Sequence, residues 1–190
     1  MVLALFSESL ERALCAALQA HEGQFRKGGN TPYIVHPLHV AFLLARYGAD
    51  DEVIQAGVLH DVVEDCDDWT LDRLRQEFGG RVASIVTELT EDKSRPWKER
   101  KQAAIDHAQD MSREAACVKA CDKLHNLESL LAQLERASNP DAVWKRFRGG
   151  REATLDMDRE LVGVLAPRVD SPLAEALRSA QASVEKLARN

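Results

Sequence analysis

The stretch Val58-Leu59-His60-Asp61-Val62-Val63-Glu64-Asp65 places four ionisable residues directly behind an apolar run. Apolar residues recur around it at spacings near 3.6, which predicts a helix with one buried face. Side chains four apart share a helix face, so His60 is expected over Glu64 and Asp61 over Asp65. Three carboxylates this close repel one another unless a cation or a proton relieves them. The stretch therefore favours a divalent metal over the alternative, a solvated acidic helix end.

The composition is that of a soluble globular protein. The chain has 190 residues, of which 45% are hydrophobic and 29% charged, so one domain spanning 1–190 is expected. The net charge of −6 argues against nucleic-acid binding. The apolar start Met1–Phe6 lacks a basic beginning and is too short for a signal peptide, and no segment approaches membrane length. Four cysteines without a CxxC pair indicate reduced thiols, so we expect a cytoplasmic protein.

Helical periodicity runs through the rest of the chain, and no segment alternates with period two long enough to predict a strand. Ser7 is placed to cap a first helix that runs to about His21, and a basic, turn-rich loop follows it. Pro37 suits the start of a second helix, and Asp50 or Asp51 caps the central one. Further helices are expected at about 71–78, 82–89, 97–111, 112–134, 144–147, 152–165 and from 171 onward. The sequence predicts an all-α fold.

A metal bound only by His60 and Asp61 would have too few ligands, and two other residues can complete the set. His36 stands at the entrance to the second helix, and Asp122 interrupts the apolar stripe of the long helix. A buried aspartate is costly unless it is paired or bound to a metal. Two imidazoles and two carboxylates suit Mn²⁺ or Fe²⁺ better than calcium. Taken separately, His36 could be a core histidine and Asp122 a capping or ion-pairing residue; their combination with His60 and Asp61 predicts a metal site.

The pattern His36 … His60-Asp61 … Asp122 resembles that of the HD-domain metal-dependent phosphohydrolases. Three longer segments narrow the resemblance to the RelA/SpoT-type alarmone hydrolases: Arg26-Lys27-Gly28 with Pro32-Tyr33-Ile34-Val35-His36-Pro37, Leu59-His60-Asp61-Val62-Val63-Glu64-Asp65, and Lys119-Ala120-Cys121-Asp122-Lys123-Leu124-His125-Asn126-Leu127. The run Leu89-Thr90-Glu91-Asp92-Lys93 with Glu99-Arg100-Lys101 is similar to the small single-domain members, which include the metazoan SpoT homologue.

The resemblance covers about residues 8–150, and the C-terminal helices at 151–190 share it only loosely. Asp156-Met157-Asp158 stands where members often carry a Trp-Tyr-Tyr-like aromatic cluster. The resemblance implies an HD-domain helical bundle of about eight to ten helices.

It also implies an enzyme that hydrolyses guanosine 3′,5′-bispyrophosphate (ppGpp or pppGpp) at the 3′ position, giving pyrophosphate and GDP or GTP. One Mn²⁺ held by His36, His60, Asp61 and Asp122 would activate the attacking water. Glu64 and Asp65, one turn further on, would orient that water and handle its proton. The alternative for this pair is that it only balances the charge of the metal.

The substrate contacts come from two basic groups. In the first, Arg26 can stack on a purine and Lys27 can meet phosphate, while Asn126 shares a helix face with Asp122 and can bind ribose or phosphate. The second group consists of Lys93, Lys98, Arg100 and Lys101. Two interpretations of it stay equally open: contact with the pyrophosphate, or a solvated charged face. The remaining histidines are interpreted as structural or exposed: His21, His39, His107 and His125.

Two other functions stay open. One is an HD-domain phosphohydrolase for another nucleotide, either an adenosine-based alarmone or a nucleoside monophosphate. The other is a non-catalytic sensor that binds the alarmone without hydrolysing it. The complete ligand set and the Glu64-Asp65 pair favour the hydrolase. A synthetase module needs far more chain than remains, so no alarmone synthesis is expected.

Overall fold

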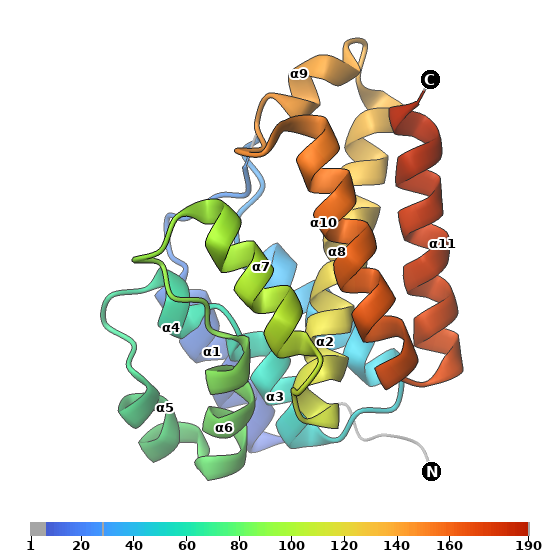
Figure 1. The fold of residues 1–190 in the computed structure, drawn as a ribbon. Coiled ribbons are helices and arrows are strands. Elements are labelled where there is room, and N and C mark those ends of the chain that lie inside the picture. The colour runs from blue at the N-terminus through green and yellow to red at the C-terminus, as the bar shows by residue number, and fades with distance from the viewer. Residues whose placement is uncertain (1–6, 28, 190) are drawn as a thin grey trace.

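The protein is described by a computed structural model that covers residues 7–27 and 29–189, and these residues form helices with no strand among them (Figure 1). The apolar start at 1–6, predicted not to be a signal peptide, and Gly28 lie outside the described residues. The predicted all-α fold is confirmed. The helices are α1 (Glu8–Ala20), α2 (Val35–Arg46), α3 (Asp51–Leu59), α4 (Val62–Asp65), α5 (Leu71–Phe78), α6 (Gly80–Leu89), α7 (Trp97–Ala108), α8 (Arg113–Arg136), α9 (Pro140–Trp144), α10 (Gly150–Leu165) and α11 (Ser171–Ala188), with a short 3₁₀ helix at Ala166–Arg168.

Side-chain caps begin several of these helices where the sequence predicts them. The Ser7 hydroxyl accepts a hydrogen bond from the Leu10 backbone N–H at 3.0 Å and so caps α1. Asp50, Thr70 and Ser112 cap α3, α5 and α8 in the same manner. Each cap satisfies a backbone N–H that the first helical turn leaves without a partner.

Helix α3 lies at the centre of the N-terminal part of the molecule and contacts α1, α2, α6 and α8. All of its residues from Val53 to Leu59 are buried. Gly57 permits the close approach of α2, because a Cβ atom at this position would lie 2.3 Å from Cδ1 of the buried Leu44. This packing holds the C-terminal end of α3 against α2, and the ring of His60, the next residue, lies 5.2 Å from the ring of His36.

The expected continuous helix through His60 and Asp61 is interrupted, so this detail of the prediction was wrong. Helix α3 ends at Leu59, and α4 begins only at Val62. The His60 imidazole Nδ1 lies 2.8 Å from the Gly57 carbonyl oxygen, which the next helical turn would otherwise use as its acceptor. His60 and Asp61 therefore lie in a turn between two helices, and the Asp61 carbonyl accepts the Asp65 N–H at 2.9 Å as α4 begins.

Two other elements differ from expectation. The short helix predicted at 144–147 lies at Pro140–Trp144, because Asn139 caps it and Pro140 occupies its first turn. Helix α2 begins at Val35, two residues before Pro37, and its Phe42 is 67% exposed. The buried face of α2 is formed by His36, Pro37, Val40, Ala41 and Leu44.

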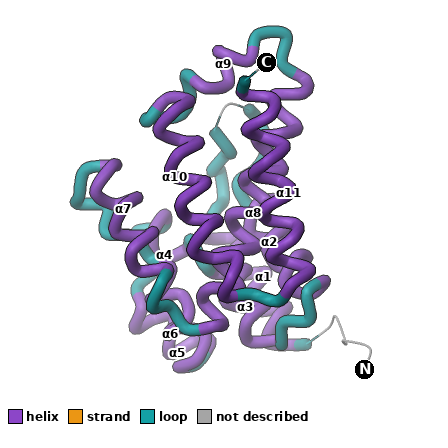
Figure 2. Tube along the Cα trace, turned by 45° about the vertical axis from the view of Figure 1, so that its right-hand side comes forward, coloured by secondary structure: helices purple, strands orange, loops and turns teal. Residues whose placement is uncertain are grey.

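The C-terminal helices pack along α8, the long helix that also carries Asp122. Helices α10 and α11 run beside α8 in both views (Figures 1 and 2), and α7 packs against α10. Lys123 on α8 reaches Asp158 on α10, with Nζ 2.5 Å from Oδ1. Asp158 belongs to the Asp156-Met157-Asp158 segment, where the resemblance led us to expect an aromatic cluster. In the part of the chain that the structure describes, no helix is both long and apolar enough to cross a membrane.

Candidate active site

Three of the predicted metal ligands meet in the core of the protein. His36 comes from α2, His60 from the turn after α3, and Asp122 from the middle of α8. One ligand atom from each lies within 4.8 Å of the other two, and the residues are only 2%, 5% and 9% exposed. The packing of α3 against α2 and α8 brings these three separated segments together.

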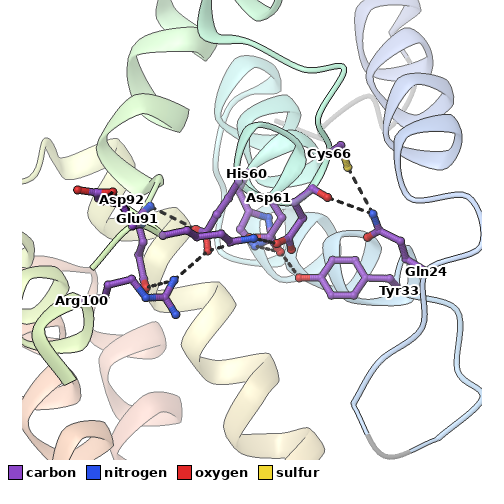
Figure 3. Close-up of polar contacts among 12 residues, drawn as sticks. Gln24, Tyr33, His60, Asp61, Cys66, Glu91, Asp92 and Arg100 are labelled. Carbon is purple, nitrogen blue, oxygen red and sulfur yellow. Dashed lines mark hydrogen bonds and ion pairs between the residues drawn. The ribbon is translucent and has the colours of Figure 1, made fainter. Parts of the chain in front are cut away.

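Asp61, the fourth predicted ligand, lies at the edge of this cluster. Its Oδ2 atom is 3.1 Å from His60 Nε2 and 3.8 Å from His36 Nε2. The Tyr33 hydroxyl donates a 2.6 Å hydrogen bond to the same oxygen and fixes its direction (Figure 3). The structure therefore groups His36, His60 and Asp122, with Asp61 beside the two histidines.

The donor set fits a divalent cation. Both histidines use their Nδ1 atoms elsewhere. His60 Nδ1 contacts the Gly57 carbonyl oxygen, and His36 Nδ1 lies 2.7 Å from His125 Nδ1. Both Nε2 atoms therefore face the carboxylates. His60 Nε2 is buried and makes no hydrogen bond of good geometry, although Asp61 Oδ2 is close. An orphaned imidazole nitrogen between two carboxylates, with its other nitrogen held by the protein, is the arrangement that metal-binding histidines adopt.

The electrostatics of the cluster favour a positive charge at its centre. Burial favours the protonated form of Asp122, but the hydrogen bond to His36 and the charge of Lys119 outweigh it and hold its pKa well below its usual range. Burial disfavours the charged form of His60, yet Asp61 and Asp122 raise its pKa to about 9, so a metal ion bound there would displace a proton from this imidazole. Burial lowers the pKa of His36, which keeps that imidazole neutral as a metal ligand must be.

The predicted catalytic pair lies on α4, beside this cluster. The Glu64 Oε2 atom accepts a 3.2 Å hydrogen bond from the Glu91 backbone N–H, and its Oε1 atom is 3.8 Å from Nη1 of Arg100. Burial raises the pKa of Glu64, as suits a group that must exchange a proton. Asp65 is more exposed and forms an ion pair with Lys93.

Arg26 of the first basic group contacts α8, the helix that carries the predicted ligand Asp122. Arg26 Nη2 donates a 2.7 Å hydrogen bond to Asn126 Oδ1, and Asn126 Nδ2 donates one of 2.6 Å to Asp122 Oδ1. Lys27 is exposed on the same loop. A ligand bound by Arg26 and Asn126 would therefore lie next to the predicted metal.

The second basic group is divided among several partners. Lys101 pairs with Glu91 at 2.6 Å, Arg100 lies between Glu91 and Glu64, and Lys98 is exposed. Because Arg100 is mostly buried among carboxylates, it does not belong to a solvated charged face.

Three neighbours of the cluster were not singled out from the sequence: Tyr33, Glu91 and His125. His125 was interpreted only as structural or exposed; it is buried and contacts His36, and its ring centroid lies 4.7 Å from that of exposed His39, with the two rings tilted. Its position one helical turn after Asp122 was the available signal. Tyr33 and Glu91 lie inside the quoted motifs, but nothing in their spacing reveals the contacts they make.

Comparisons with known proteins agree with this geometry. A family model of the HD domain matches residues 13–153. The guanosine-3′,5′-bis(diphosphate) 3′-pyrophosphohydrolase MESH1 of Danio rerio is 46% identical over 117 residues, which cover 60% of this chain and 64% of the relative. The human protein of the same name is 40% identical over 126 residues, covering 65% and 70%. The match thus spans about two thirds of these relatives' own length.

Solved structures give the same result. A metazoan ortholog of SpoT, described as hydrolysing ppGpp, matches with a TM-score of 0.80 and 29% identity over 92% of this chain and 94% of that one. A Listeria monocytogenes protein matches with a TM-score of 0.69 and 32% identity, covering 80% of this chain and 98% of its own. The chain belongs to the HD-domain family, among the small single-domain relatives of SpoT.

Proposed function

We propose that this protein hydrolyses guanosine 3′,5′-bispyrophosphate at the 3′ position, releasing pyrophosphate together with GDP from ppGpp or GTP from pppGpp. The observation that carries the proposal is the buried cluster of His36, His60 and Asp122 with the Glu64-Asp65 pair beside it. The names of the metazoan relatives, which are those of 3′-pyrophosphohydrolases, support the same reaction.

The four residues His36, His60, Asp61 and Asp122 would hold one divalent ion. The mixed nitrogen and oxygen donor set supports Mn²⁺ as that ion, with other first-row metals as competitors. When bound, such an ion lowers the pKa of a water molecule and withdraws charge from the phosphorus atom.

Glu64 and Asp65 would manage the attacking water. Glu64 Oε2 is already engaged by the Glu91 amide, which leaves Oε1 to accept the proton. Asp65 would orient the water from the more open side, where its partner Lys93 is exposed to incoming phosphate. Proton transfer by a positioned carboxylate typically contributes about 10²- to 10⁴-fold to a rate.

The nucleotide would enter beside Asn126. Arg26 would stack on the guanine base, Asn126 would bind the ribose or a phosphate, and Lys27 would meet phosphate as an exposed point charge. Lys93 and Arg100 would face the 3′-pyrophosphate. We further propose that residues 1–190 act as one domain, since α10 and α11 pack on the metal-bearing α8. The free cysteines support a cytoplasmic location.

The decisive experiment is an assay of the purified protein with ppGpp and Mn²⁺, in which pyrophosphate release is followed directly. The matched controls are the same mixture with a chelator and a panel containing the adenosine analogue and GMP. Mn²⁺-dependent release from ppGpp supports the proposal. Turnover of another nucleotide alone would assign a different HD phosphohydrolase, and binding of ppGpp without release would assign a sensor.

A further inference from the structure

Glu91, in the segment between α6 and α7, is a buried carboxylate to which the reaction gives no direct role. Its side chain is 9% exposed. Its Oε1 atom lies 2.6 Å from Lys101 Nζ, and its Oε2 atom lies 3.4 Å from Arg100 Nη1. Its backbone N–H donates to Glu64 Oε2, so Glu91 contacts the predicted general base and both neighbouring cations. Figure 3 labels Glu91 and Arg100.

Arg100 lies between two competing carboxylates. Its Nη1 atom is 3.4 Å from Glu91 Oε2 and 3.8 Å from Glu64 Oε1, and its side chain is only 13% exposed. Glu91 Oε2 is buried and makes no hydrogen bond of good geometry, so charge alone draws the guanidinium toward it. The structure thus shows Arg100 shared between Glu91 and Glu64, and bonded closely to neither.

Sharing matters because a closed arginine–carboxylate pair would impair a general base. Hydrogen-bonded pairs of this kind are short and often bidentate, so the arginine occupies the carboxylate oxygens and lowers the pKa of the carboxyl group. Were Glu91 uncharged, Arg100 would need to move only a short way to close such a pair with Glu64. The Glu64 oxygen left free by the Glu91 amide would then be occupied.

We propose that Glu91 is a positioning residue for Glu64 that acts through Arg100. Its carboxylate retains the guanidinium at a distance, so that Glu64 Oε1 stays available to water. The inference rests on the proposed function, since it assigns Glu64 the role of base.

The test is Glu91→Gln, which removes the negative charge but keeps the side-chain length and the backbone N–H that binds Glu64. Asp92→Asn is the matched control, because Asp92 is the adjacent exposed carboxylate and binds Ser94 and Arg95 within its own loop. With ppGpp and Mn²⁺, we expect Glu91→Gln to lower kcat about tenfold, the effect of one pKa unit at the base. The Mn²⁺ affinity from calorimetry should stay within about twofold, and Asp92→Asn should match the wild type.

The route through the arginine is tested by repeating the change in an Arg100→Met background. There Glu91→Gln should lower kcat by less than about twofold, because no guanidinium remains to close on Glu64. An equal loss in both backgrounds, a loss confined to KM, or a weakened Mn²⁺ site would each overturn the proposal.

A second measurement does not depend on turnover. Titration of the Glu64 carboxyl group by ¹³C NMR should give a lower pKa in Glu91→Gln than in the wild type, and a much smaller difference in the Arg100→Met background. The other charged groups around Glu64 are unchanged between these proteins: Asp61, Asp65, Lys93 and Lys119. If the wild type released no pyrophosphate, the proposed function would fail, while an unchanged Glu64 pKa would count against the Glu91 inference alone.

Discussion

The buried cluster is held in place differently from the basic residues at the edge of the site, Lys27 and Lys93, which we call the rim. His36, His60 and Asp122 come from packed helices and are held from behind by contacts such as those to Gly57 and His125. Both rim residues lie on exposed loops, and Lys93 is held there by its ion pair with Asp65. We therefore expect the buried cluster to hold its geometry ahead of ion binding, and ion pairs of the rim, such as that between Lys93 and Asp65, to rearrange when a nucleotide binds.

The largest effect is expected from Asp122→Ala, which removes a ligand from the core cluster. The variant should lose Mn²⁺ binding in calorimetry and at least about 10³ in kcat/KM, because the ion contributes several kcal/mol to the reaction. Normal Mn²⁺ affinity in this variant would contradict the assignment of Asp122 as a ligand.

Glu64→Gln tests whether Glu64, which lies between the buried cluster and the rim, is a general base and not a metal ligand. A general base one turn from the ligands should cost about 10²- to 10⁴-fold in kcat when neutralised. Mn²⁺ affinity should be retained, since Glu64 is not among the four ligands. Loss of the metal together with the rate would show that Glu64 belongs to the core cluster instead.

Gly57→Ala probes the packing beneath the cluster without touching a ligand. The new Cβ would lie 2.3 Å from Cδ1 of buried Leu44, and overpacking of this kind costs about 1–3 kcal/mol. We expect the melting temperature to fall by several degrees, which a thermal melt would measure. Gly163→Ala in α10 is the control: a Cβ there meets nothing within 4 Å, so a small stabilisation is expected. Equal melting temperatures for both variants would mean that the α2–α3 contact is looser than the structure shows.

The smallest effect is expected at the rim. Lys27→Ala should raise KM about two- to fivefold with little change in kcat, because an exposed charge contributes weakly. The difference should shrink as ionic strength rises and screens the charge. A fall in kcat at constant KM would place Lys27 in the chemistry and not in substrate capture.

The sequence was a good guide to the core and a poor one to the contacts around it. Regular apolar spacing predicts the helices, and polar residues that interrupt it, such as Asp122, reveal the cluster. The break at His60 was missed because it depends on an imidazole taking the Gly57 carbonyl, which local spacing does not encode. The division of the second basic group was missed for a similar reason: Glu91 captures Arg100 and Lys101 only once the segment before α7 has folded beside α4.

The bond between Lys123 and Asp158 carries a consequence for how this protein can be shortened or rebuilt. It fastens α10, most of which lies beyond the matched residues 13–153, to the residue next to a predicted metal ligand. Deleting α10 would deprive the partly buried Lys123 ammonium group of its carboxylate partner, on α8, the helix that carries Asp122. The C-terminal helices are thus tied to the helix that carries a predicted ligand, and grafting those of another member here would require exchanging both ends of that bond.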